Sequence, residues 1–298
     1  MGSRPTVKAI VKGKPVEVPT LLSAIAKKKN RDPFIATNYR SDVLLVQELF
    51  NVLIRHAHGS LAPYFSELPE NGTNDEGYIH LLIETLQNRE GIQGKERELN
   101  MMLPQGETMK ALAAKALDIL CNTKTVPVLQ TLSTFPQIRA MLETIAWAEG
   151  LNDDYRRIVI GIVKQTPNGK YKEFIGKSSR EIVISLDEHP QIYVDWKKGE
   201  KLSSAAGRFQ LVYSTWEEVQ KIYHFPDFSP RSQELGAIAR MVRREMIRPL
   251  LTRNYEGAFR NGNREWASFP GSPYGQHHKS MTEIVEVYKK HLASFRNK

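Results

Sequence analysis

The sequence is poor in cysteine and has no long apolar run. Its 298 residues include a single cysteine, Cys121, so no disulfide can form within the chain. The longest apolar stretches fall far short of the roughly 20 residues that a membrane-spanning helix requires. No apolar segment follows the first residues, so no secretory signal is expected. These absences argue against a disulfide-stabilised or membrane-spanning protein.

Acidic residues are outnumbered, and the imbalance is uneven along the chain. The formal net charge is +9, from 42 lysines and arginines against 33 acidic residues. Residues 1–136 carry 16 basic and 14 acidic side chains, whereas residues 137–298 carry 26 and 19. Such a charge suits an anionic partner: nucleic acid, a lipid surface or an acidic cell-wall polymer. Nucleic acid is disfavoured because the basic residues are dispersed and no recognition motif accompanies them.

The first part of the chain is expected to be small and mainly helical. Residues 1–40 are rich in lysine, proline and asparagine and predict an N-terminal arm with a short strand pair around Val7–Val18. Residues 41–121 predict a helical domain, in which Thr108 caps the last helix. Apolar residues repeat at helical spacing in three stretches, 42–57, 78–90 and 109–119.

The second part is expected to have an α+β fold. Residues 122–136 lose the helical spacing and contain two prolines, which predicts a linker. Residues 137–298 follow as helix, small sheet and further helices. Within them Pro167-Asn168-Gly169 predicts a hairpin turn. The predicted helices are 137–150, 214–223, 231–250, 254–260 and 280–295.

Two glutamates in one predicted helix differ in the face that they occupy. The expected buried stripe of this helix consists of Ile138, Met141, Leu142 and Ile145. Glu143 falls on the opposite face, which predicts a solvated charge, whereas position 149 continues the stripe by one turn. Gly150 then predicts the end of the helix. Glu149 is therefore either an exposed last-turn glutamate or a carboxyl directed into apolar surroundings.

A carboxyl in the second situation is suited to general acid catalysis. Burial without a cationic partner raises a carboxyl pKa, and the negative end of the helix dipole acts in the same direction. A carboxylic acid that is still protonated near neutral pH has a proton to donate to a leaving group. Glu149 is on this ground a candidate catalytic acid.

Six short motifs follow one another through residues 138–293. They are Ile145-Ala-Trp-Ala-Glu149-Gly150, Asp187-Glu-His189-Pro190, Ser203-Ser-Ala-Ala-Gly207-Arg208-Phe209-Gln210-Leu211, Thr215-Trp216, Asp227-Phe-Ser229-Pro230-Arg-Ser-Gln233 and Trp266-Ala-Ser268-Phe-Pro270-Gly271-Ser-Pro-Tyr274-Gly275-Gln276. In this order they resemble the lambda-type phage endolysins, a family of lysozyme-like lytic transglycosylases. The resemblance implies a lysozyme-like catalytic domain over residues 137–298. Its substrate would be peptidoglycan, cleaved between N-acetylmuramic acid and N-acetylglucosamine.

The resemblance also implies roles for single residues. Glu149 matches the catalytic acid of the family, which protonates the leaving oxygen and then acts as base while the C6 hydroxyl of the muramic acid attacks the anomeric carbon. The product is a 1,6-anhydro sugar, formed without water, a cofactor or the second carboxylate of ordinary glycosidases. Five residues are expected to line the substrate cleft: Ser204, Gly207, Gln210, Tyr274 and Gln276.

Other motif residues have structural interpretations that stay open. Arg208 is either a cleft residue or a structural ion-pair partner, and Trp147, Trp216 and Trp266 are either sugar platforms or core. His189-Pro190 is expected to shape a loop, and Asp227-Phe-Ser-Pro to begin a helix. No zinc site is expected, because His277-His278 lacks companion ligands at metal spacing.

The chain departs from the family between the catalytic helix and the Asp187 motif. Val163–Ile184 predicts an enlarged β-hairpin that would reshape one end of the cleft. Asp187 and Glu188 are then expected near the cleft, and if either activates a water, the enzyme would be a hydrolytic muramidase. A non-catalytic cell-wall-binding or phage structural protein is the other alternative.

The N-terminal half resembles helical peptidoglycan-binding domains. The matching pattern is Asp42-Val-x-x-Val46-Gln47-x-Leu49-x-Asn51, Asn71-Gly72-x-x-Asp75-Glu76, Leu86-Gln87 and Pro104-x-Gly106-x-Thr108-x-x-x-Leu112. A wall-binding module would raise the effective concentration of the catalytic half on an insoluble polymer. The alternative is a small helical bundle used for docking or stability.

The expected partners follow from the expected substrate, the glycan strands of peptidoglycan. Without an export sequence, the protein is expected to be made in the cytoplasm and to reach the periplasm and cell wall by another route. That route is a holin pore, a secretion machine or a phage particle. A secreted effector would also have an immunity protein as partner. Neither nucleic acid nor a membrane span is expected.

Overall fold

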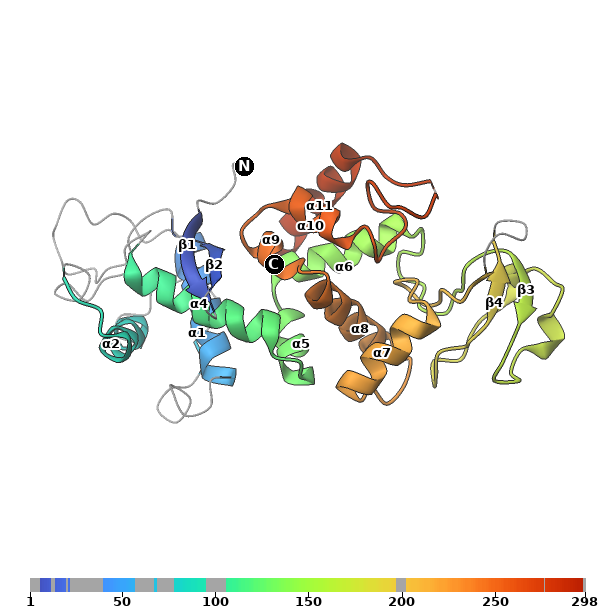
Figure 1. Cartoon of the computed structure of the whole chain (residues 1–298), viewed down its shortest axis with the longest axis horizontal. Coiled ribbons are helices and arrows are strands. Elements are labelled where there is room, and N and C mark those ends of the chain that lie inside the picture. Colours follow the sequence, from blue (N-terminus) through green and yellow to red (C-terminus); the bar gives the residue numbers. More distant parts are fainter. Residues whose placement is uncertain are drawn as a thin grey trace. The chain divides into compact units, whose positions relative to one another are not determined.

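The computed structural model describes residues 6–11, 14–19, 21, 40–56, 67–68, 78–94, 106–196, 202–275 and 277–296. The chain divides into two compact units. Figure 1 shows the helices and strands of the described residues along the chain. The first unit contains residues 1–123 and 248–254, and the second contains residues 124–247 and 255–298. None of the described helices is long and apolar enough to cross a membrane.

The first unit is built around helix α4 (Glu107–Asn122). Helices α1 (Arg40–His56) and α2 (Tyr78–Glu90) contact α4, so the unit is mainly helical as predicted. Strands β1 (Thr6–Val11) and β2 (Lys14–Pro19) form the predicted antiparallel pair, with Val7 opposite Val18. This pair also contacts α4, and Ala9 and Val18 are buried. Strands β1 and β2 of the expected arm are therefore packed into the unit.

Buried polar side chains tie the elements of the first unit together. Asn51 of α1 exchanges two hydrogen bonds with the backbone of Leu68, at 2.9 and 2.7 Å. Gln87 of α2 donates to the hydroxyl of Thr108 at 3.0 Å. The prediction that Thr108 caps α4 is wrong, because the N-cap is Gly106 and has no side-chain cap. The Thr108 hydroxyl instead links α4 to α2.

The two prolines of the expected linker begin helices. Pro127 lies in the first turn of α5 (Val126–Leu132), and α6 (Pro136–Ala148) begins at Pro136. Proline suits this position because its missing N–H would have no partner there and its φ is already helical. Leu129 and Leu132 of α5 are buried, and α5 contacts helix α8. The linker prediction is therefore wrong over α5.

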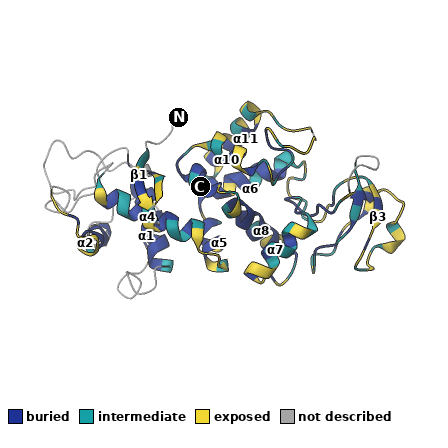
Figure 2. Ribbon diagram, in the orientation of Figure 1, coloured by how far each residue is buried: buried dark blue, intermediate teal, exposed yellow. Residues whose placement is uncertain are grey.

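Helices α6 and α8 (Pro230–Arg243) form the centre of the second unit, and their inner faces are largely buried in Figure 2. Helix α11 (Met281–Arg296) packs along α6 and contacts α10 (Tyr255–Gly262), and α7 (Tyr213–Tyr223) packs on α8. A Cβ at Gly236 of α8 would lie 3.0 Å from the ring of Trp216 of α7. Glycine thus allows these two helices to approach closely.

The start of α8 follows the predicted helix-start motif. Pro230 is the first residue, and the hydroxyl of Ser229 accepts from the N–H of Ser232 at 3.3 Å. The carboxylate of Asp227 accepts from Ser229 N–H and from the Ser232 hydroxyl at 3.0 and 2.7 Å. The predicted single helix over 231–250 is in fact α8 and the short α9 (Ile247–Leu251), because Glu245 has φ +53° and breaks it.

A small antiparallel sheet completes the α+β fold. Its strands β3 (Ile162–Gln165), β4 (Tyr193–Asp195) and β5 (Leu202–Ser203) lie in that order. The predicted hairpin over 163–184 is wrong as a two-stranded pair, because β3 pairs with β4 and the returning chain forms no strand. The returning chain meets β3 through the Ile162–Ser178 bridge and backbone hydrogen bonds of Val163 with Gly176 and Lys177. Gly169 and Tyr171 have positive φ, and two 3-10 turns, η1 (Lys172–Phe174) and η2 (Ser179–Glu181), follow.

Candidate active site

Glu149 is the C-cap of helix α6, and Gly150 ends the helix with φ +74°. Gly150 N–H donates to Trp147 O and Leu151 N–H donates to Ala146 O, both at 3.0 Å. These two bonds form a Schellman motif, which needs a left-handed residue directly after the cap. Glycine adopts that conformation without a Cβ penalty. The predicted role of Gly150 in ending the helix is confirmed, and the motif fixes the backbone of Glu149.

The Glu149 carboxyl is enclosed by protein, although the residue as a whole is intermediate in exposure. Burial raises the pKa of Glu149 above its ordinary value of 4.5, and hydrogen bonding from Ser268 offsets part of that rise. The Ser268 hydroxyl donates to Oε1 of Glu149 at 2.6 Å. Among the described residues no other side chain forms a hydrogen bond or ion pair with this carboxyl. The site is thus a buried acid whose hydrogen bonds come from one neutral residue, Ser268, through its hydroxyl and its backbone N–H.

Ser268 lies on a loop that is held by hydrogen bonds on both sides. The indole N–H of Trp266, a buried residue, donates to the backbone oxygen of Phe209 at 3.2 Å. On the other side, Lys279 N–H donates to Ser268 O at 2.8 Å. Ser268 itself is buried. The sequence motif contains Ser268, but spacing gave no reason to single it out, because its partner Glu149 lies 119 residues earlier.

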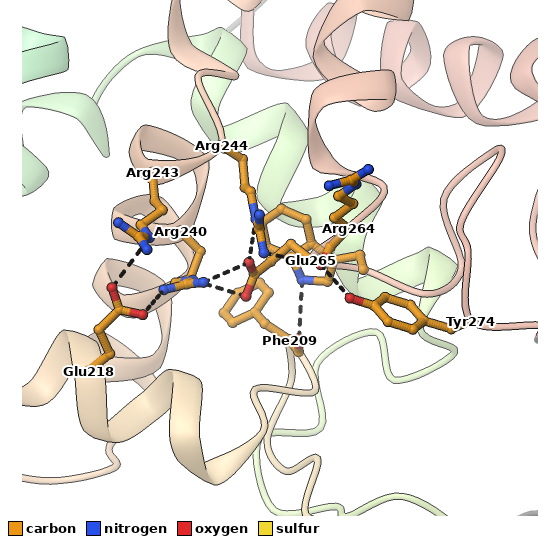
Figure 3. Close-up of polar contacts among 9 residues, drawn as sticks. Phe209, Glu218, Arg240, Arg243, Arg244, Arg264, Glu265 and Tyr274 are labelled. Atoms are coloured by element: carbon orange, nitrogen blue, oxygen red, sulfur yellow. Dashed lines mark hydrogen bonds and ion pairs between the residues drawn. The ribbon is translucent and has the colours of Figure 1, made fainter. Parts of the chain in front are cut away.

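A cluster of charged residues holds the same loop to helix α8 (Figure 3). Nε and Nη2 of Arg240 donate to the two carboxylate oxygens of Glu265, each at 2.9 Å, and Nε of Arg244 donates to Glu265 Oε2 at 2.8 Å. Nη1 of Arg240 also donates to Glu218 of α7 at 2.7 Å. The side chains of Arg240 and Glu265 are only 5% and 6% exposed. This cluster was missed, although a basic residue between the buried Ala239 and Met241 was a usable signal.

Glu143 is not the solvated charge that its helix face predicted. Nη2 of Arg208 donates to Glu143 Oε2 at 2.6 Å and to Asp153 Oδ1 at 3.1 Å. The same guanidinium donates to Asn152 O and to the Tyr155 hydroxyl. The Arg208 side chain is 4% exposed, so the interpretation as a structural ion-pair partner is confirmed. The prediction for Glu143 is wrong because Arg208, which comes from a distant loop, pairs with it and leaves its side chain only 32% exposed.

Gly207 and Gln210 lie in one tight turn. Gly207 has φ +75° and Gln210 φ +48°, and the Gln210 side-chain amide donates to Gly207 O at 3.0 Å. A Cβ on Gly207 would lie 2.1 Å from Oε1 of Gln233 and 3.0 Å from the ring of Phe228. Internal packing therefore already requires glycine here. Sugar binding by either residue stays a prediction.

The remaining expected cleft residues differ in their surroundings. Ser204 is buried, and its hydroxyl accepts from Tyr213 N–H at the start of α7 at 2.9 Å. Tyr274 is 48% exposed, and its hydroxyl donates to Arg264 O at 2.8 Å, so that one ring edge is fixed while the ring stays accessible (Figure 3). Gln276 lies outside the described residues. Sugar contacts by these residues stay predictions.

Asp187 and Glu188 are each engaged within their own surroundings. Asp187 is exposed, and its carboxylate accepts from the hydroxyl of Ser185. Glu188 forms an ion pair with Lys170 at 2.6 Å, with both side chains about half exposed. Neither carboxylate contacts Glu149. Exposure favours ordinary solvated carboxylates at both positions.

His189 shapes its loop as predicted. Burial lowers the pKa of His189 to about 4, so the ring is neutral at physiological pH. Nδ1 of His189 accepts a hydrogen bond from the backbone N–H of Gln191 at 3.2 Å. Since a neutral ring has one acceptor and one donor nitrogen, Nε2 donates to Leu211 O at 2.9 Å. The ring also contacts Tyr213 and Phe228, with centroids 5.5 and 4.9 Å away. A histidine fixed in this way serves structure.

The three tryptophans of the sequence motifs fall into two classes. Trp216 and Trp266 are core residues. Trp147, two residues before Glu149, is partly exposed, and the ammonium of Lys279 lies 4.3 Å from its ring centroid, within cation–π range. His277 and His278 are exposed, and within the described part of the chain no three His, Cys, Asp or Glu side chains gather to hold a metal ion.

Known proteins resemble this chain over its second half. The family model described as Endolysin matches residues 139–295. The endolysin of Escherichia phage P2 is 33% identical over 123 residues, covering 36% of this chain and 74% of that protein. The endolysin of Escherichia phage lambda is 29% identical over 154 residues, covering 51% of this chain and 89% of that protein. The solved structure of bacteriophage lambda lysozyme complexed with a chitohexasaccharide is 25% identical, covers 53% of this chain and 94% of that chain, and has a TM-score of 0.41. This chain belongs to the lambda-type phage endolysin family, whose members degrade peptidoglycan.

Proposed function

We propose that this endolysin is a lytic transglycosylase in which Glu149 acts first as general acid and then as base. The observation that carries the proposal is the enclosed Glu149 carboxyl, whose pKa is raised by burial and whose Oε1 accepts a hydrogen bond from Ser268. A carboxyl with a raised pKa keeps its proton to higher pH, as a general acid requires. Because Ser268 occupies Oε1, the transferable proton sits on Oε2.

The proposed reaction uses one carboxyl twice. Oε2 of Glu149 gives its proton to the oxygen that links N-acetylmuramic acid to the next sugar, and the bond from that oxygen to the anomeric carbon breaks. The C6 hydroxyl of the same muramic acid then attacks the anomeric carbon, and its proton passes to the carboxylate. The acid is thereby regenerated, and the product carries a 1,6-anhydro ring. No water is consumed.

The surroundings of the other acidic residues support this reaction over hydrolysis. A hydrolase of the usual kind needs a second carboxylate, placed to activate water or to attack the sugar. Glu143 pairs with the buried Arg208, whereas Asp187 and Glu188 are solvated carboxylates in contact with Ser185 and Lys170, and none of the three contacts Glu149. The substrate alcohol then replaces water as the nucleophile.

The substrate proposed for this site is the glycan strand of peptidoglycan. Tyr274 offers an accessible ring for stacking on a sugar face, and the side-chain oxygen of Gln210, to which none of the described residues donates, can accept from an N-acetyl N–H. Gly207, Ser204 and Gln276 are proposed to complete the lining. Because this substrate lies outside the cytoplasm, the proposal includes delivery to the wall by a holin, a secretion machine or a phage particle. In the case of a secreted effector, it also includes an immunity protein as partner.

The experiment that tests the proposal is product analysis of purified sacculi. Mass spectrometry of the digest is expected to show muramic acid ends that lack one water relative to reducing ends. Glu149→Gln should lower the rate about 100- to 10,000-fold, the usual contribution of a general acid. Glu256→Gln, which removes an exposed ion pair with Arg260, is the control and should digest walls at the wild-type rate. Reducing ends as the main product would overturn the proposed reaction.

A further inference from the structure

We propose that Ser268 is a positioning residue for the Glu149 carboxyl, and that the cluster of the buried Arg240 and Glu265 with the partly exposed Arg244 keeps Ser268 in place. This inference rests on the proposed function only in taking Glu149 as the acid. It assigns a purpose to a charged cluster that, within the described part of the chain, contacts neither Glu149 nor the expected sugar-binding residues.

The first step is the hydroxyl contact itself. Ser268 donates to Oε1 of Glu149 at 2.6 Å, a length typical of a hydroxyl bonded to a carboxylate. Ser268 is 7% exposed, so water cannot readily take over this hydrogen bond. The contact selects one orientation of the carboxyl group and leaves Oε2 as the oxygen that faces a leaving group.

The second step is the attachment of the loop. Glu265 lies three residues before Ser268 and receives three hydrogen bonds, two from Arg240 and one from Arg244. Nη2 of Arg244 also donates to the backbone oxygen of Arg264 at 3.2 Å (Figure 3). A bidentate arginine–carboxylate pair fixes direction as well as distance. Helix α8 thus determines where this loop leaves the core.

The third step is the indole between the cluster and the hydroxyl. Trp266 follows Glu265 directly, and its N–H donates to Phe209 O at 3.2 Å. Its ring packs against Phe269 with centroids 5.4 Å apart, and both rings are buried. The residues on either side of Ser268 are therefore held by hydrogen bonds and packing. A shift of Glu265 would move Ser268 relative to α6.

The consequence is a defined protonation equilibrium at Glu149. A donor to the carboxylate stabilises the charged form and so lowers the pKa, against the larger effect of burial. Without the hydroxyl, the pKa of Glu149 rises further, and the protonated acid survives to higher pH. Because activity is lost when Glu149 loses that proton, activity should then persist to higher pH. The maximal rate should fall, because the Glu149 carboxyl is no longer held in one orientation.

The test compares Ser268→Ala with Ser268→Thr. In Ser268→Ala, the alkaline limb of the pH–rate profile on sacculi should move to higher pH, and the maximal rate should fall about tenfold, the worth of one hydrogen bond to a charged group. Ser268→Thr keeps the hydroxyl, so its alkaline limb should lie at the same pH as that of the wild-type protein. Carbon-13 NMR of the Glu149 carboxyl, identified by its absence in Glu149→Gln, should show the same rise in pKa without any substrate.

A double-mutant cycle tests the role of the cluster. Glu265→Gln should move the limb in the same direction as Ser268→Ala, but should add no further movement in the Ser268→Ala background, because it acts through Ser268. Arg260→Gln removes an exposed ion pair on α10 and is the control that should leave the profile unchanged. Circular dichroism melting checks that each variant is folded.

Two results would overturn the inference. The first is that Ser268→Ala changes neither the alkaline limb of the pH–rate profile nor the NMR titration of Glu149. The second is that Glu265→Gln moves the alkaline limb equally in the wild-type and Ser268→Ala backgrounds. The NMR readout is independent of the reaction catalysed. If wild-type protein yields reducing ends but the Glu149 titration moves as expected, the proposed transglycosylation fails while the positioning role stands.

Discussion

At the scale of single residues, two glutamates of helix α6 have opposite relations to stability. Glu149 is a buried carboxyl beside a neutral hydroxyl, whereas Glu143 forms an ion pair with the buried Arg208. The first costs folding free energy whenever it is ionised, and the second satisfies a buried cation. Enzymes commonly lose some stability by holding a catalytic group in an environment that disfavours its charge, because activity requires that environment.

Replacement of Glu149 by glutamine should therefore stabilise the protein at neutral pH. Because the folded-state pKa of Glu149 is raised, its favourable contribution is complete below the unfolded pKa and is lost as pH rises through the folded pKa. Glu149→Gln should raise the melting temperature by a few degrees at neutral pH, and this gain should shrink below about pH 4. Thermal unfolding followed by circular dichroism at both pH values measures it.

The matched control on the same helix is Glu143→Gln. It leaves the guanidinium of Arg208 with a weaker acceptor and should cost about 1–3 kcal/mol of unfolding free energy at neutral pH. If both variants changed stability in the same direction, the contrast drawn between the two carboxyls would be wrong.

Sequence spacing could place Glu149 but could not describe its environment. The stripe from Ile138 to Ile145 is local, so its continuation to position 149 could be read directly from helical periodicity. The pairing of Glu143 spans 65 residues and that of Glu149 spans 119, and no local pattern encodes either. The family resemblance supplied the role of Glu149, and the contact with Ser268 came from the structure.

At the scale of elements, the turn at Gly207 connects the expected cleft to the core. Gln233 of α8 is fully buried, and its side chain accepts from Arg208 N–H and donates to Tyr155 O and Phe228 O. These three bonds prevent Gln233 from moving aside for a larger residue at position 207. The turn and α8 therefore form one rigid piece.

Gly207→Ala should be far more costly than alanine at a glycine in open space. The Cβ would meet a pinned oxygen at 2.1 Å in a left-handed backbone, so we expect a loss of about 2–5 kcal/mol. Gly176 has φ +83° with nothing within 4 Å of an added Cβ, and its replacement should cost only about 1–2 kcal/mol. Urea unfolding measures both, and equal costs would refute the packing explanation.

The sequence predicted which segments are helical better than it predicted where helices begin and which strands pair. Most predicted helices agree with the structure because apolar periodicity identifies long amphipathic segments. The prolines at 127 and 136 were misread because proline marks loops and helix starts alike. The hairpin over 163–184 was misread because a turn signal at Gly169 does not specify which later segment pairs with β3.

At the scale of the whole molecule, the charge is the clearest global property. A net charge of +9 favours approach to an anionic polymer, and most of the excess lies in residues 137–298. The peptidoglycan-binding role expected for the first unit from its sequence would act in the same direction. Its matching residues Asn51, Gln87 and Thr108 form internal links in this structure, whereas Asn71 to Glu76 lie outside the described residues.

Wall binding should consequently weaken with salt. The Debye length falls from about 8 Å at physiological ionic strength to about 3 Å at 1 M, so attraction between exposed charges is screened. Co-sedimentation of Glu149→Gln with purified sacculi separates binding from digestion and should show a steep decrease in the bound fraction over this range. Binding that is independent of salt would show that charge does not guide this protein to the wall.

The measurement that tests the central claim most directly is digestion of sacculi in water enriched in heavy oxygen. If the C6 hydroxyl of the sugar is the nucleophile, the released muramic acid ends carry the 1,6-anhydro ring and no heavy oxygen. This is the predicted result, because Glu149 has no second carboxylate in contact with it among the described residues. Reducing ends that contain heavy oxygen would contradict the account, since water would then have attacked the anomeric carbon.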